Sequence, residues 1–190
     1  MKTRESGMPD EKMWDTFFDP DTILDSLGIK NLTGNIADFG CGYGTFTIPA
    51  AKRTKGKVYA LDIEKEMVQI TQEKAKQSGL NNVVAIQKDF MTGGTGLADS
   101  SCDIVLLFNI LHAENPLNIL VESKRILTSG GAVAIIHWIP DPTTPRGPPM
   151  SIRPHPEEIQ NWLKEAGYKL KNTIIPLPPY HYGLLGKKTD

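Results

Sequence analysis

The 190-residue sequence lacks the features that mark secreted, membrane-embedded and nucleic-acid-binding proteins. Its formal net charge is −1, so the protein as a whole has no electrostatic field that would attract nucleic acid or anionic lipid. No apolar run is long enough to span a bilayer, and the polar start has no apolar core of the kind that a signal peptide needs. We therefore expect a cytoplasmic protein with no nucleic-acid partner and no membrane insertion.

Cysteine is scarce as well. The two cysteines, Cys41 and Cys102, lie far apart in the sequence, and neither belongs to a CxxC pair or has a histidine at ligand spacing. Without a secretory signal, two such residues are expected to be reduced thiols rather than a disulfide. The pattern also gives no support for a zinc site, and we expect no metal.

Short runs rich in β-branched residues alternate with longer helical runs along most of the chain. Strands are expected at 35–39, 57–62, 83–87, 103–108, 132–138, 169–175 and 180–185, and helices at 45–53, 65–77, 116–127 and 156–166. This alternation is typical of an α/β fold with a doubly wound, mostly parallel sheet. Residues 176–179 are too few for a parallel crossover, so the last two strands should form an antiparallel hairpin.

Two segments lie outside this alternation. Residues 1–34 are predicted to form a short N-terminal helical cap, with amphipathic helices at 13–18 and 23–27, ahead of a main domain at 35–190. The aromatic residues of the cap either pack against the domain or form a substrate lid. Seven prolines between 140 and 156 exclude helix and central strand, which predicts a long ordered loop over one end of the sheet.

A glycine-rich loop, from Asp38 to Gly44, follows the first predicted strand. Open parallel sheets bind ligands at this place, outside the carboxyl ends of the strands. In a dinucleotide-binding fingerprint the third glycine would come one position later, where this sequence has Thr45. Asp62 ends the second strand, about twenty residues on, where a carboxylate can accept hydrogen bonds from both ribose hydroxyls of an adenosine.

With these motifs the sequence resembles the class I S-adenosylmethionine-dependent methyltransferases, in particular the small-molecule branch that includes ubiquinone/menaquinone-biosynthesis-like enzymes. The resemblance is carried by residues 36–44, 58–63, 87–90 and 103–111, and it covers roughly 35–138. It implies a Rossmann-like methyltransferase fold whose seven-stranded sheet ends in a hairpin. It also implies S-adenosylmethionine as the cofactor and S-adenosylhomocysteine as its product.

Carried over by position, the resemblance implies a set of cofactor contacts. Gly40, Gly42 and Gly44 would face the methionine part of the cofactor, and Asp38 would reach its amino group. Asp62 would hold the ribose, and Ile63 and Met67 would lie against the adenine ring. Asp89, beside Phe90, would accept from the adenine amino group, and Asn109 would close the site at the end of the fourth strand.

The methyl acceptor is expected to be a small molecule, although the family does not specify which one. Its pocket should be built from the N-terminal helices, residues 109–114 and the proline-rich loop, including Arg146 to Pro149 and Arg153. His112 and His137 follow the fourth strand and end the fifth, so both are candidate catalytic bases for an acceptor that must lose a proton. His155 is expected to cap the helix that follows it.

Two alternatives remain open at the level of the sequence. The same sheet and the acidic Asp62 also suit an NAD-dependent oxidoreductase, although the glycine spacing disfavours it. A catalytically silent module that binds the cofactor without turnover would show the same loop. The sequence does not indicate an oligomeric state.

Overall fold

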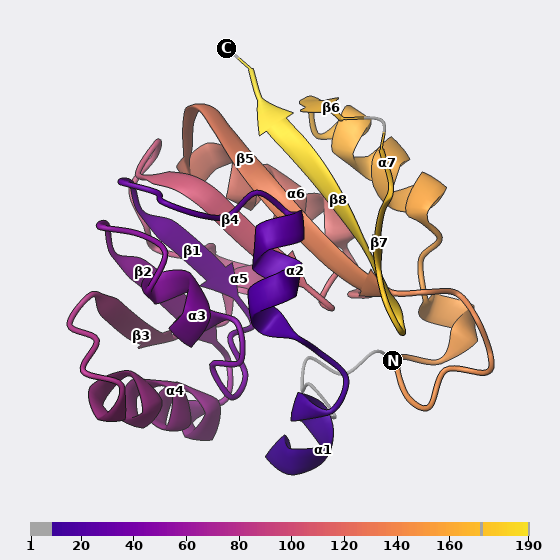
Figure 1. Ribbon diagram of the computed structural model, residues 1–190. Helices are drawn as coiled ribbons and strands as arrows, with labels where there is room; N and C mark the ends of the chain where they lie inside the picture. The colour runs from indigo at the N-terminus through magenta and orange to yellow at the C-terminus, as the bar shows by residue number, and fades with distance from the viewer. Residues whose placement is uncertain (1–8, 172, 190) are drawn as a thin grey trace.

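The computed structural model describes residues 9–171 and 173–189, and within this part of the chain one sheet of eight strands lies at the centre (Figure 1). The strands are β1 (Ile36–Phe39), β2 (Val58–Asp62), β3 (Val83–Gln87), β4 (Cys102–Phe108), β5 (Leu127–Trp138), β6 (Tyr168–Leu170), β7 (Ile175–Leu177) and β8 (His181–Lys188). Their order is β3-β2-β1-β4-β5-β8-β6, and β7 also pairs with β8. Strands β1 to β5 are parallel, whereas β8 runs antiparallel to each of its neighbours.

The predicted doubly wound, mostly parallel sheet and its antiparallel end are therefore confirmed. The sheet has one strand more than predicted, because the segment expected as a single strand at 169–175 forms both β6 and β7. Leu170 pairs with Gly186 and Ile175 pairs with Gly183. The segment from Leu170 to Ile175 therefore advances five residues while β8 advances only three. The surplus residues interrupt the ladder between the two short strands.

The helices are α1 (Glu11–Asp15), α2 (Pro20–Ser26), α3 (Thr47–Ala51), α4 (Lys65–Gln77), α5 (Phe90–Gly93), α6 (Pro116–Ile126) and α7 (Pro156–Glu165), with a 3₁₀ turn, η1, at Met150–Ile152. Helix α4 has the predicted bounds and is followed by Gly79 at φ +66°, the left-handed conformation typical of a helix end. His155 is the N-cap of α7, as predicted, and its backbone N–H donates to the Glu158 carboxylate at 2.7 Å. The short helix α5 was not predicted.

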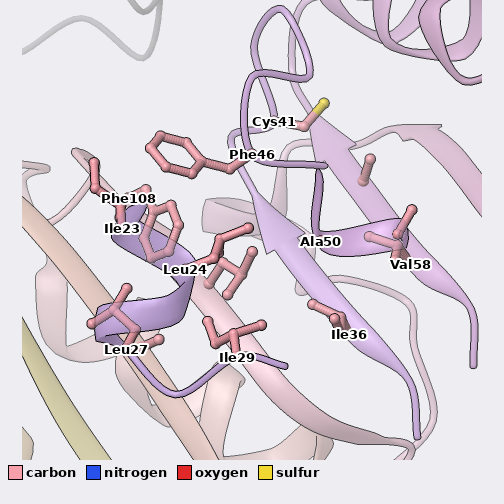
Figure 2. Close-up of a cluster of buried hydrophobic side chains, with 14 of the residues drawn as sticks. Ile23, Leu24, Leu27, Ile29, Ile36, Cys41, Phe46, Ala50, Val58 and Phe108 are labelled. Carbon is pink, nitrogen blue, oxygen red and sulfur yellow. The ribbon is translucent and has the colours of Figure 1, made fainter. Parts of the chain in front are cut away.

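Two apolar clusters fill the two faces of the sheet. One joins α2, α3 and α4 to one face, and the other joins α6 and α7 to the opposite face. Figure 2 shows Ile23 and Leu24 of α2, and Leu27 directly after it, in one cluster with Ile29 and with Ile36 of β1. Helix α2 thus shares a core with the rest of the domain, while the predicted boundary at residue 34 stays a prediction. None of the helices within residues 9–171 and 173–189 has the length and apolar character that crossing a membrane requires.

The proline-rich segment after β5 forms an ordered loop, as predicted, and Arg153 holds it together. The buried guanidinium of Arg153 donates to the carbonyl oxygens of Ile139, Asp141, Arg146 and Pro148 and to the hydroxyl of Thr144, at 2.7–3.3 Å. Prolines have no backbone N–H with which to pair such carbonyls. A single side chain with five N–H groups supplies the missing donors.

Candidate active site

A cavity of about 620 Å³ lies where the parallel strands end, and segments from both sides of the sheet line it. Helix α1 and the loop after β5 lie at this end of the sheet (Figure 1). Eight of the ten predicted cofactor residues line the cavity: Asp38, Gly40, Gly42, Asp62, Ile63, Asp89, Phe90 and Asn109. The other two do not: Gly44 borders a separate surface groove, and Met67 is buried in α4.

The glycine loop between β1 and α3 has a backbone that only glycine adopts easily. Gly40, Gly42 and Gly44 have φ of +73°, +50° and +75°. A Cβ atom on Gly40 would lie 3.0 Å from Cγ2 of Ile110, and one on Gly44 would lie 3.0 Å from the Thr71 hydroxyl oxygen. Backbone conformation therefore accounts for all three glycines, and close packing adds a second reason for Gly40 and Gly44.

Asp62, at the end of β2, braces this loop. Its Oδ2 accepts from the backbone N–H of Gly42 at 2.9 Å, and its Oδ1 accepts from that of Glu64 at 3.0 Å. The side chain is buried, and burial is the main cause that raises the pKa of its carboxyl. A carboxylate oxygen can accept more than one hydrogen bond, so these two bonds leave Asp62 able to accept further hydrogen bonds from a ligand.

Asp38 lies in the neighbouring strand β1, opposite Ala60 of β2, and its carboxyl is more deeply buried than that of Asp62. Burial raises the pKa of Asp38 to about 6, the Thr47 hydroxyl that donates to its Oδ2 at 2.6 Å opposes the rise, and the charge of Asp62 adds to it. A cationic ligand group beside Asp38 would favour its ionised form. Thr47 was not identified from the sequence, because a threonine in a predicted helix carries no signal of its contact.

Asn109, directly after β4, lines the cavity and has two side-chain polar atoms without a hydrogen-bond partner among the residues described. Its backbone is left-handed, with φ +56°, and its backbone N–H donates to the carbonyl oxygen of Ile136. Both of these side-chain atoms are buried. A buried amide without partners is costly, so this side chain is suited to binding a ligand in the cavity.

Asp89 and Phe90 border the cavity after β3. The Asp89 carboxylate caps α5, accepting from the Met91 backbone N–H at 3.0 Å and from the Thr92 hydroxyl at 2.9 Å. Phe90 packs against Phe39, with ring centroids 4.9 Å apart. The cap holds Asp89 at the cavity wall.

The two candidate bases are in contact, but only one of them reaches the cavity. His112 is part of its lining, whereas His137 is fully buried and is not. Nδ1 of His112 lies 3.3 Å from Nε2 of His137. Burial, more than the neighbouring His112, holds the pKa of His137 well below its usual range, so His137 is neutral.

The remaining wall belongs to the segments expected to bind the acceptor. Trp14 and Phe17 of the N-terminal segment line the cavity together with Trp138 and residues 146–149. Phe17 also packs on Trp138, with ring centroids 5.3 Å apart, so the predicted packing role and contact with the site coincide. Arg153 was expected in the pocket, but its guanidinium is engaged with the loop backbone behind it.

Comparison with known proteins agrees with this geometry. A family profile described as "Methyltransferase domain" matches residues 31–173. Ribosomal protein L11 methyltransferase of Caldanaerobacter subterraneus subsp. tengcongensis is 36% identical over 140 residues, 74% of this chain and 32% of its own. Demethylmenaquinone methyltransferase of Geobacillus stearothermophilus is 32% identical over 97 residues, 50% of this chain and 41% of its own. The chain thus spans less than half the length of these two relatives.

A solved structure agrees over almost the whole chain. A SAM-dependent methyltransferase from Aquifex aeolicus superposes with a TM-score of 0.82 at 28% identity, covering 94% of each chain. These matches give no support to the NAD-dependent oxidoreductase alternative. The chain therefore belongs to the methyltransferase-domain family, and the predicted membership of the class I S-adenosylmethionine-dependent methyltransferases is confirmed.

Proposed function

We propose that the protein binds S-adenosylmethionine and transfers its methyl group to a small-molecule acceptor, leaving S-adenosylhomocysteine. The observation that carries the proposal is the braced loop: Asp62 holds Gly42 in position, and both residues line the cavity that Asp38 and Asn109 also border. A loop that only shaped a tight turn would not need buried carboxylates and an unpaired amide beside it.

The residues present suit the cofactor. Asp38 is a buried carboxylate that an ammonium group would stabilise, and Asp62 retains acceptor capacity for ribose hydroxyls. The Asn109 amide offers two donors and an acceptor to a polar ligand. Asp89 beside Phe90 suits the adenine end, with Ile63 on the same side of the site.

When bound, the cofactor supplies an electrophilic methyl group on a positively charged sulfur. The task of the chain is then to orient the acceptor and to exclude water. Phe17 and Trp138 form an apolar wall for this purpose, and the loop fastened by Arg153 completes it. His112 is the titratable imidazole in the lining, and it is our candidate for accepting a proton from the acceptor.

The size of the cavity supports a small acceptor. Sites for small molecules commonly measure about 300–1,000 Å³. At about 620 Å³, the cavity has to hold both the cofactor and the acceptor. This volume lies within the range for small-molecule ligands, which favours a small-molecule acceptor.

Cofactor binding by calorimetry tests the first half of this proposal. Replacing Asp62 with alanine should weaken S-adenosylmethionine binding by roughly 2–4 kcal/mol, because charge-assisted hydrogen bonds to the ligand and to the loop are both lost. Glu73→Ala, on the exposed face of α4, is the matched control. An unchanged dissociation constant for Asp62→Ala would contradict the ribose assignment.

Turnover tests the second half. Formation of S-adenosylhomocysteine is measured with a broad panel of small hydroxyl, amine and thiol compounds. Product with any of them supports methyl transfer. Tight cofactor binding without product from the whole panel would favour the silent binding module instead.

A further inference from the structure

The contact between His112 and His137 determines where each ring carries its proton. His137 is fully buried and neutral, so it has one N–H and one lone pair. Its Nδ1 lies 3.4 Å from the carbonyl oxygen of Trp138, which can only accept a hydrogen bond. The proton of His137 is therefore on Nδ1, and its Nε2 carries the lone pair.

The same reasoning extends to His112. Its Nδ1 lies 3.3 Å from that unprotonated Nε2 of His137, so Nδ1 of His112 must be the donor. In the neutral ring this leaves Nε2 of His112 unprotonated, and His112 lines the cavity. The contact with His137 thus favours one of the two tautomers of His112.

We infer that His112 accepts the proton of a weakly acidic hydroxyl on the methyl acceptor, and that His137 is a positioning residue that keeps the accepting nitrogen unprotonated. This inference rests on the proposed function and adds the chemistry of the acceptor to it. An unprotonated Nε2 attracts a group that bears a hydrogen, which a carboxylate or a tertiary amine does not offer.

The surroundings explain why a base is needed. Phe17, Trp138 and Pro148 line the same cavity, and such apolar walls favour the neutral form of a weakly acidic hydroxyl over its anion. The hydroxyl proton passes to Nε2 of His112, and the oxygen's electron pair forms the bond to the methyl carbon. The electrons of the broken carbon–sulfur bond stay on sulfur, so charge and atoms balance.

The groups around His137 are consistent with a neutral partner that strengthens the base. His181, Arg153 and Tyr182 lie near its ring, and none of them supplies a carboxylate. When His112 becomes an imidazolium, its Nδ1–H donates more strongly to the lone pair of His137. His137 thus stabilises the protonated base without contacting the acceptor.

Nitrogen-15 spectra of the full chain test the tautomers directly. The protein has four histidines, so a ¹⁵N-histidine-labelled sample gives few signals, which His112→Gln and His137→Leu variants assign. At a pH where His112 is neutral, the wild-type protein should show His112 protonated at Nδ1. A wild-type His112 protonated at Nε2 overturns the inference, and this result needs no substrate.

A matched pair of variants tests the role of His137. In His137→Leu the acceptor is lost, and His112 should shift toward the Nε2-protonated form. His137→Gln restores an oxygen that can accept from Nδ1, and it should retain the wild-type pattern. If the tautomer of His112 is the same in His137→Leu as in the wild type, His137 does not position it.

Phenol and anisole, added with S-adenosylhomocysteine, test the class of acceptor. Phenol should shift the Nε2 resonance of His112, while anisole, which has the same ring but no hydroxyl hydrogen, should not. Equal responses to both probes, or no response to phenol, would overturn the assignment of a hydroxyl acceptor. Calorimetry of S-adenosylmethionine is done separately, so failure of cofactor binding, and with it of the proposed function, is distinguishable from failure of this inference.

Discussion

Replacing Asp38 with asparagine removes one buried charge and little else. The asparagine oxygen can still accept from the Thr47 hydroxyl, which donates to Asp38 at 2.6 Å, and the two side chains have nearly the same shape. Asp38 is 3% exposed, so its charged form is held almost without water. The substitution therefore measures what ionisation of this residue costs the ligand-free protein.

The pKa of Asp38 determines the size and sign of that cost. It is raised from 3.8 to about 6, mainly by burial, so between these values the folded protein binds the proton more tightly than the unfolded chain. Stability thus falls as the pH rises through this window and stays at the lower level above it. At 1.36 kcal/mol per pKa unit, the cost is about 3 kcal/mol at pH 8 and about half of that at pH 5.

Urea unfolding of the wild type and Asp38→Asn at both pH values measures this cost. We expect the variant to be more stable at pH 8, by up to about 3 kcal/mol, with a clearly smaller gain at pH 5. Glu73→Gln, an exposed carboxylate on α4, should change neither value. A variant that is less stable at pH 8, or equally changed at both pH values, would refute the reasoning.

The same variant should bind the cofactor less well. A charge-assisted hydrogen bond to the cofactor's amino group would be lost, which corresponds to about 1.5–3 kcal/mol. Wild-type binding near pH 6 should also release protons, because a cationic ligand lowers the pKa of Asp38. Calorimetry in buffers of different ionisation enthalpy detects that release, and its absence would place the amino group elsewhere.

Three further substitutions test the scaffold. Gly44→Ala and Gly79→Ala both place a side chain at positive φ, which costs roughly 1 kcal/mol, but only Gly44 has a neighbour, Thr71, at 3.0 Å, whereas Gly79 has nothing within 4 Å. Gly44→Ala alone should weaken cofactor binding in calorimetry, and equal binding by both variants would contradict this. Arg153→Met should lower stability by roughly 2–4 kcal/mol and expose the bond after Arg146 to trypsin. Unchanged cleavage would show that the loop does not depend on Arg153.

Much of the fold could be predicted because local patterns and burial agree. The strands β1 and β4 are mostly apolar and mostly buried, and α4 is followed by a clear glycine stop. The glycine spacing and Asp62 are also local signals, since both lie at strand ends whose relative positions follow from the βαβ connection. From these the cofactor loop could be located in the chain.

Features that depend on the pairing of distant segments could not be predicted from the sequence. The division of one expected strand into β6 and β7 depends on their registers against β8. Asp38 and Thr47 meet only because the chain turns between β1 and α3, and Arg153 satisfies carbonyls that prolines leave unpaired.

The two histidines show most clearly the difference between what the sequence determines and what the tertiary structure decides. The sequence alone placed His112 and His137 near the ends of two strands and made both candidates for the same role. Only the parallel pairing of β4 with β5 brings them to 3.3 Å, with one ring lining the cavity and the other buried behind it. Local pattern determines which residues end a strand, whereas burial and hydrogen bonding across strands determine which of them can contact a ligand.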